Sequence, residues 1–238
     1  DFETRLLSDG QGVLSEVFEG GIALSGDEET LLSEDSRVAA GFGAGLSADG
    51  ARRSEALLPE PALLDPDPVQ SDPTLHFTMV PQAGAVAYRV ELASDAGFVD
   101  RLADEVVTGE AITLPGIADG RHYVRLSSVS PNGFYGQPVS YSFRRLLNAV
   151  TAEGGPVEDG FLFKWTSVGN STREYRFQLF RDNSAGVPIV DETGLTGHAF
   201  HLGNMAPGTY VWRLASIAYA DGERFENWTS PQKLIVTE

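Results

Sequence analysis

Apolar and polar residues alternate most clearly in two stretches of the chain, which lie 87 positions apart. In each stretch three apolar side chains alternate with two polar ones: Tyr88, Val90 and Leu92 with Arg89 and Glu91, and Tyr175, Phe177 and Leu179 with Arg176 and Gln178. Successive side chains of a β-strand point to opposite faces, so a period of two is typical of a strand with one buried face. We therefore predict two strands whose apolar side chains pack in a core and whose polar side chains lie in water.

These two strands belong to an internal repeat. Residues 88–95 (YRVELASD) match 175–182 (YRFQLFRD), 112–114 match 200–202, and 120–129 (GRHYVRLSSV) match 208–217 (GTYVWRLASI), always at an offset of 87 or 88. Turn-forming residues recur about every eight to twelve positions, which is typical of a small antiparallel sandwich. The predicted core residues are Tyr88, Val90, Leu92 and Leu126 in the first unit, and Tyr175, Phe177, Leu179, Trp212 and Leu214 in the second.

The residues before the repeat predict short strands followed by a linker. Glycines at 41, 43 and 45 interrupt an apolar stretch, and they indicate close backbone packing rather than a helix, because glycine weakens a helix. A run of proline and aspartate follows, from Pro59 to Pro73. Proline fixes φ and lacks an N–H donor, so we expect this run to be an extended linker outside the sheets.

Composition and charge exclude several kinds of partner and site. The chain of 238 residues has a net charge of −17, which disfavours nucleic acid and anionic membrane surfaces as partners, because both would repel it. The absence of cysteine excludes disulfides, thiolate metal sites and cysteine nucleophiles. No apolar run approaches the length of about 18 residues that a membrane span needs, so we expect no direct membrane insertion.

Two family resemblances follow from these residues. The repeat unit resembles a fibronectin type III-like domain, with Met79 and Trp165 in matching places where a large side chain should fill the space between the sheets. Residues 15–24 (SEVFEGGIAL), 38–43 (VAAGFG) and 57–61 (LLPEP) resemble the end of a FecR domain. The FecR resemblance implies that this segment is the C-terminal part of that domain, whose earlier strands would precede Asp1.

We therefore predict an all-β protein: a partial FecR-type β domain followed by two fibronectin III-like antiparallel β-sandwiches. The predicted boundaries are residues 1–60 for the FecR-type segment, 61–73 for the linker, 74–147 for the first repeat and 148–238 for the second. We keep the names N-terminal segment, first repeat and second repeat for these parts.

No residue pattern in the chain predicts catalysis, a cofactor or a metal ion. The sequence lacks a nucleophile elbow, a P-loop, a dinucleotide-binding glycine motif and a zinc-protease motif. His198 and His201 would point to opposite faces of a strand, which disfavours a shared metal. Asp65, Asp67 and Asp72 form a loose cluster broken up by prolines, which we interpret as solvated charge rather than a calcium site.

Aromatic loops are the remaining candidate for recognition. Phe134 and Tyr135 in one repeat, and Phe225 and Trp228 in the other, lie in matching loops. Exposed aromatic side chains anchor partners or stack on sugars, although they also close the ends of sandwiches.

These observations predict a non-enzymatic binding module of the bacterial cell envelope, periplasmic or secreted, acting in interaction or signal sensing as the FecR resemblance implies. Its partner would be an envelope protein or the peptidoglycan or polysaccharide of the cell wall. The alternative is a peptidoglycan- or polysaccharide-binding accessory module of a cell-wall enzyme. A truncated domain should also expose a strand edge, and open edges pair with other chains. We therefore expect self-association through residues 16–24.

Overall fold

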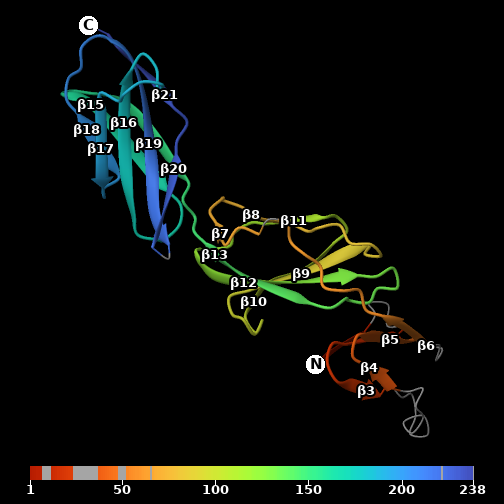
Figure 1. Ribbon diagram of the computed structural model, residues 1–238. Helices are drawn as coiled ribbons and strands as arrows, with labels where there is room; N and C mark the ends of the chain where they lie inside the picture. The colour runs from red at the N-terminus through yellow and green to blue at the C-terminus, as the bar shows by residue number, and fades with distance from the viewer. Residues whose placement is uncertain (7–11, 24–36, 48–51, 65, 221, 238) are drawn as a thin grey trace. The chain divides into compact units, whose positions relative to one another are not determined.

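The computed structural model describes residues 1–238 except 7–11, 24–36, 48–51, 65, 221 and 238 (Figure 1). All helix and strand elements of the described residues are β-strands, as predicted. The chain forms two compact units. One comprises residues 1–67, 76–113 and 122–143, and the other comprises residues 68–75, 114–121 and 144–238.

The N-terminal segment folds as a four-stranded antiparallel sheet with a small hairpin beside it. The sheet has the order β1-β2-β5-β6, and the hairpin joins β3 to β4. The strands are β1 (Phe2–Leu6), β2 (Gly12–Val17), β3 (Gly21–Ala23), β4 (Arg37–Ala39), β5 (Phe42–Ser47) and β6 (Arg52–Ala56). Val17, Val38 and Ala44 form a small buried cluster with Ile22 packed against it.

The predicted open edge at residues 16–24 is wrong for Glu16 and Val17, but Gly21–Ala23 has a partner strand on one side only. Glu16 and Val17 belong to β2, which pairs with β1 on one side and with β5 on the other. Gly21–Ala23 pairs with Arg37–Ala39, and Leu24 lies outside the described residues. The edges of the four-stranded sheet are β1 and β6, because β1 supplies the partner that β2 would otherwise lack.

Glycine in β5 allows the close packing that the sequence indicates. A Cβ atom on Gly43 would lie 2.5 Å from Cδ1 of Phe134, and one on Gly45 would lie 2.7 Å from Cδ2 of Leu14. Real Cβ atoms do not approach so closely, so a larger residue at either position would have to displace its neighbour. Glycine is therefore required here for space.

The first repeat has two sheets, of order β10-β9-β12-β13-β7 and β11-β8. Phe77 and Phe143 meet edge to face in its core, with ring centroids 5.2 Å apart. Met79 is fully buried, in the core place predicted for it. The strands are β7 (Val69–Gln70), β8 (Leu75–Thr78), β9 (Ala87–Ala93), β10 (Arg101–Val107), β11 (Ala111–Leu114), β12 (Gly120–Val129) and β13 (Val139–Arg145).

The proline- and aspartate-rich run does not stay outside the sheets, which corrects the prediction of a free linker. Leu63 forms an isolated antiparallel bridge with Met79 and is buried. Val69 and Gln70 form β7, which pairs in parallel with Arg144 and Arg145 of β13. A short edge strand tolerates flanking prolines, because only one of its sides needs N–H donors.

The second repeat is the more aromatic sandwich. Its sheets have the orders β14-β15-β18 and β17-β16-β19-β20, and β21 also pairs with β19. The long strand β19 pairs with β21 over its first half and with β20 over its second half. The strands are β14 (Val150–Val157), β15 (Gly160–Ser167), β16 (Arg173–Arg181), β17 (Val190–Leu195), β18 (Ala199–Leu202), β19 (Gly208–Ala220), β20 (Glu223–Trp228) and β21 (Gln232–Val236).

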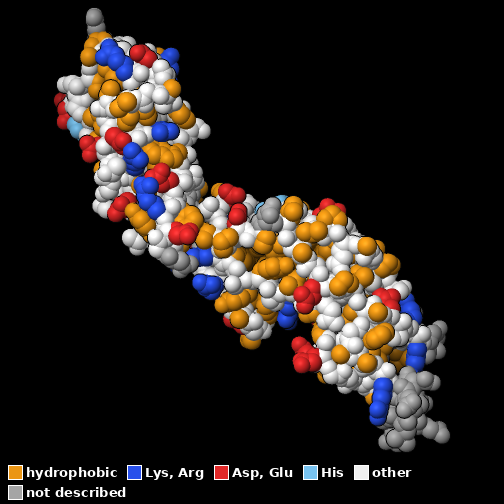
Figure 2. Space-filling model, in the orientation of Figure 1, with side chains coloured by type: hydrophobic (Ala, Val, Ile, Leu, Met, Phe, Trp, Pro, Cys, Tyr) orange, Lys and Arg blue, Asp and Glu red, His pale blue; other side chains and the backbone are white. Residues whose placement is uncertain are grey.

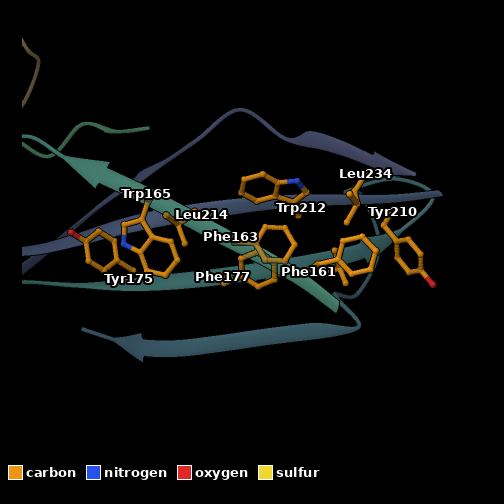
Figure 3. Close-up of a cluster of buried hydrophobic side chains, with 10 residues drawn as sticks. Phe161, Phe163, Trp165, Tyr175, Phe177, Tyr210, Trp212, Leu214 and Leu234 are labelled. Atoms are coloured by element: carbon orange, nitrogen blue, oxygen red, sulfur yellow. The ribbon is translucent and has the colours of Figure 1, made fainter. Parts of the chain in front are cut away.

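Aromatic rings fill the space between these two sheets (Figure 3). The Phe163 ring lies 4.5 Å from the Phe177 ring and 4.9 Å from the Trp212 ring, measured between centroids. Trp165 is 3% exposed and fills the predicted place between the sheets. All nine core residues predicted from the repeat are buried. The five in the second repeat pack in one cluster, which confirms the predicted register there.

Candidate interaction surfaces

The polar side of β9 is buried, contrary to the prediction that it lies in water. Arg89 is 7% exposed and Glu91 is 2% exposed, and every residue of β9 is buried. The pattern assigned these side chains correctly to the face away from the core. It did not reveal that another part of the chain covers this face.

Two arginine–carboxylate pairs organise this face, which we call the first outer face (Arg89, Glu91, Asp104 and Arg125). Arg89 donates from Nε to Oδ1 and from Nη2 to Oδ2 of Asp104, both at 2.8 Å. Arg125 donates from Nε and Nη2 to the two oxygens of Glu91, at 2.7 and 2.8 Å. Such two-pronged pairs fix the side chains in one geometry.

These pairs shift the pKa values of Arg89 and Asp104 in opposite directions. Burial alone would lower the pKa of Arg89, but the hydrogen bond to Asp104 and the charges of Glu91 and Glu3 outweigh burial, so this pKa is raised. The hydrogen bond from Arg89 is the largest cause that lowers the pKa of Asp104. Both groups are therefore ionised at neutral pH.

The N-terminal segment covers the first outer face. Nη1 of Arg89 donates to both carboxylate oxygens of Glu3 in β1, at 2.8 and 2.9 Å. Arg89 thus binds two carboxylates with different edges of its guanidinium group. A strand 86 positions away supplies the second one.

A second cluster fastens the same segment to the loop after β12. Oε1 of the fully buried Glu16 accepts from Nη2 of Arg5 at 2.9 Å and from the backbone N–H of Tyr135 at 3.0 Å. Arg5 also donates to the backbone carbonyl of Gly133. The Tyr135 ring lies under two guanidinium groups, with its centroid 3.8 Å from Cζ of Arg5 and 4.8 Å from Cζ of Arg89.

Phe134 is the centre of this contact rather than an exposed recognition residue. Its side chain is 1% exposed and lies over Gly43. Glu55 of β6 accepts hydrogen bonds from Ser130 and Asn132 of the same loop. The premise that Phe134 is a surface aromatic is therefore wrong, because the N-terminal segment packs on it.

The second repeat carries the same arrangement on its own outer face, formed by Arg176, Gln178, Asp191 and Arg213. Arg176 donates from Nε to Oδ1 and from Nη2 to Oδ2 of Asp191, both at 2.7 Å. Arg213 donates from Nε and Nη2 to Oε1 of Gln178, at 2.9 and 2.7 Å. The hydrogen bond with Asp191 raises the pKa of Arg176 and lowers that of Asp191.

Of the other two candidate aromatics, Trp228 lies beside the second outer face and Phe225 does not. The Trp228 ring is 4.3 Å from Cζ of Arg213, and its Nε1 donates to Glu226 at 3.1 Å. Phe225 is partly buried against the cluster of Leu146, Ala218 and Ala220. Trp228 is therefore half-buried at the border of this face, and recognition by either residue stays a prediction.

The histidines and acids do not converge on a metal site among the described residues. His201 bonds Asp159 at 3.1 Å, while His198 lies near the Tyr175 ring. Asp65 of the loose acidic cluster lies outside the described residues. Over the part of the chain that the structure describes, no helix is long and apolar enough to cross a membrane.

Sequence reasoning missed Glu3, Glu16, Asp104 and Asp191. The sequence does contain a signal for Asp104 and Asp191: they lie 87 positions apart, as Arg89 and Arg176 do. Glu16 lies in the phrase of residues 15–24, but nothing in that phrase indicates its partner, and no signal marks Glu3; the partners of both on the first repeat lie far away in the sequence.

No family model matches the chain, and no curated protein matches it. Among solved structures, a segment of two fibronectin type III domains from chicken tenascin is 16% identical, with a TM-score of 0.38. The match covers 76% of this chain and 98% of that chain. A cytokine receptor complex is 14% identical with a TM-score of 0.42, and that match covers 68% of this chain and 90% of that chain.

Proposed function

We propose that the chain is a non-enzymatic interaction module of the bacterial cell envelope, periplasmic and of the FecR type, which works through protein contacts. The observation that carries this proposal is the use of one outer face as a docking surface. The first outer face holds the N-terminal segment through Arg89, while the second repeat repeats the same side-chain pairs. A face of this kind recognises another protein segment by hydrogen bonds and charge, and it needs no bond chemistry.

The residues of the FecR resemblance have defined structural roles that fit this proposal. Glu16 of the E-V-F-E-G phrase holds Arg5 and the backbone of Tyr135, and Gly43 of the A-G-F-G phrase makes room for Phe134. These motif residues attach the N-terminal segment to the sandwich that follows it. The FecR-type segment and the first repeat would thus act as one module.

The contacts of the aromatic residues favour a protein partner over a sugar. Stacking on a sugar needs a free ring face. Tyr135 lies under the guanidinium groups of Arg5 and Arg89, Trp228 carries that of Arg213, and Phe134 is buried. Three of the four candidate aromatics are therefore engaged by the chain's own side chains.

Sedimentation with purified peptidoglycan sacculi, alongside cross-linking to a periplasmic protein extract, tests the proposal. We expect the full chain to stay in the supernatant with sacculi, to release no soluble muropeptides, and to form a saturable cross-link with an envelope protein. Sedimentation with sacculi that is lost in Trp228→Ala would instead establish the polysaccharide-binding alternative. Muropeptide release would show an enzyme.

A further inference from the structure

The two outer faces are chemically equivalent at three positions. Arg89 and Arg176 each grip an aspartate with Nε and Nη2, and the two aspartates, Asp104 and Asp191, lie at the same offset. Arg125 donates from Nε and Nη2 to Glu91, which lies two positions after Arg89. Arg213 donates from the same two atoms to Gln178, which lies two positions after Arg176. The repeat has therefore kept a polar surface as well as a core.

The faces differ in what covers the first arginine. The Arg89 side chain is 8% exposed, and its Nη1 holds the Glu3 carboxylate. The Arg176 side chain is 29% exposed, and its hydrogen bonds to carboxylate oxygens use only Nε and Nη2. Among the described residues, none places a carboxylate on Nη1 of Arg176.

The two arginines of the second outer face have fewer carboxylates around them than those of the first, although Glu174 and Glu226 lie on the same face, two positions from Arg176 and Trp228. Gln178 stands where the first face has Glu91, so Arg213 is held by a neutral oxygen instead of a carboxylate. The second carboxylate that contributes to the pKa of Arg176 is Glu226, which already pairs with Arg224 and accepts from Trp228. Figure 2 shows basic and acidic side chains interspersed with hydrophobic ones on the visible face of this repeat.

We infer that the outer face of the second repeat binds an extended acidic segment of a protein partner, with a carboxylate on Nη1 of Arg176 as Glu3 binds Nη1 of Arg89. This inference rests on the proposed function and names the partner's chemistry. The remaining contacts would come from Arg213 and Trp228, which lie side by side at the border of the face. An extended strand suits this surface because the equivalent ligand, Glu3, comes from strand β1.

Nuclear magnetic resonance of the full chain tests the inference through the Nε–Hε signals of Arg176 and Arg213. The probe is a capped hexapeptide in which threonine and glutamate alternate, and its matched control carries glutamine in place of each glutamate. We expect the glutamate peptide to shift both signals and the glutamine peptide to leave them unchanged.

Variants distinguish binding at Arg176 from a general attraction of the peptide to positive charge. Arg176→Gln should weaken binding of the glutamate peptide about tenfold or more, because a hydrogen bond to a charged group is lost. Arg176→Lys should fall between this variant and the parent chain. Lys164→Gln removes an equal charge from an exposed position on β15 of the other sheet and should leave the affinity unchanged.

Equal shifts with the glutamine peptide, or with inorganic phosphate at the same concentration, would overturn the inference, as would full affinity in Arg176→Gln. The proposed function has its own test, since a cross-link to an envelope protein that persists in Arg176→Gln would sink only the acidic-segment site. Sedimentation with sacculi would sink the proposed function whatever the peptide does.

Discussion

The outer faces of the two repeats share an arginine–aspartate pair and lie in different environments. In the first repeat Arg89 is buried beneath the N-terminal segment and binds both Asp104 and Glu3. In the second repeat Arg176 keeps its aspartate and remains partly exposed. The repeats therefore share a polar outer face, and one copy of it joins the N-terminal segment to the first sandwich.

The inner faces show the opposite relation: both are buried in a sandwich core, but their residues differ. Val90 and Val124 of the first repeat correspond to Phe177 and Trp212 of the second, and all four are buried. A core accepts different apolar side chains if volume is redistributed among neighbours. A hydrogen-bonded charge pair needs defined donors and acceptors, so it tolerates less change.

The largest expected effect comes from the aromatic core. Phe177→Ala should lower the free energy of unfolding of the second repeat by about 3–5 kcal/mol, since it opens a cavity beside Phe163 and Trp212. All three tryptophans lie in the second repeat, so tryptophan fluorescence during urea unfolding reports on that repeat alone. Val90→Ala, its counterpart in the first repeat, should leave the fluorescence transition in place. A shift of equal size would mean that the repeats unfold as one unit.

Arginine replacement addresses the difference between the outer faces directly. Arg89→Gln should cost about 2–3 kcal/mol, because Asp104 and Glu3 lose their bonds to the guanidinium group. The buried Glu91 keeps Arg125 but then lies near two carboxylates whose charge Arg89 no longer balances. Arg176→Gln should cost less than about 1 kcal/mol, as for an exposed ion pair. Hydrogen exchange of the β9 and β16 amides measures both. Equal costs would show that coverage by the N-terminal segment does not matter.

Glycine replacement in β5 tests the contact between Gly43 and Phe134, through which the N-terminal segment packs on the first repeat. Gly43→Ala should cost about 1–3 kcal/mol and speed amide exchange in β2 and β5, because the new methyl group would overlap Phe134. Gly155→Ala is the matched control, since a Cβ there meets no atom within 4 Å. Combining Gly43→Ala with Phe134→Leu should cost less than the sum of the two single changes. If the two costs simply add, the destabilisation by Gly43→Ala does not come from overlap with Phe134.

The smallest effect is a dependence of stability on acid pH. The pKa values of Asp104 and Asp191 are both lowered, mainly by their hydrogen bonds from Arg89 and Arg176. Their contribution to stability is present above the ordinary aspartate pKa of about 3.9 and is lost as pH falls through the lower folded values. Asp191→Asn should flatten this dependence in the fluorescence transition of the second repeat. A second repeat that becomes more stable below about pH 4 would contradict the pairing.

The sequence was sufficient to predict the repeat, the all-β class and the core. The alternation around Tyr88 and Tyr175 follows from the backbone, because a strand places alternate side chains on opposite faces whatever surrounds it. The glycines of β5 likewise indicate close packing, although they do not indicate that Phe134 and Leu14 are the neighbours. Each of these inferences depends on residues that are neighbours in the chain or that repeat at a fixed offset.

Only the tertiary structure decided what covers each face. Alternation shows that Arg89 and Arg176 point away from the core, but it does not show that Glu3 lies over one of them. The burial of Phe134 has the same origin, since it depends on the space that Gly43 leaves in another sheet. Such contacts join segments far apart in the sequence, and their strength depends on complementary shape and charge that appear only once both segments are folded.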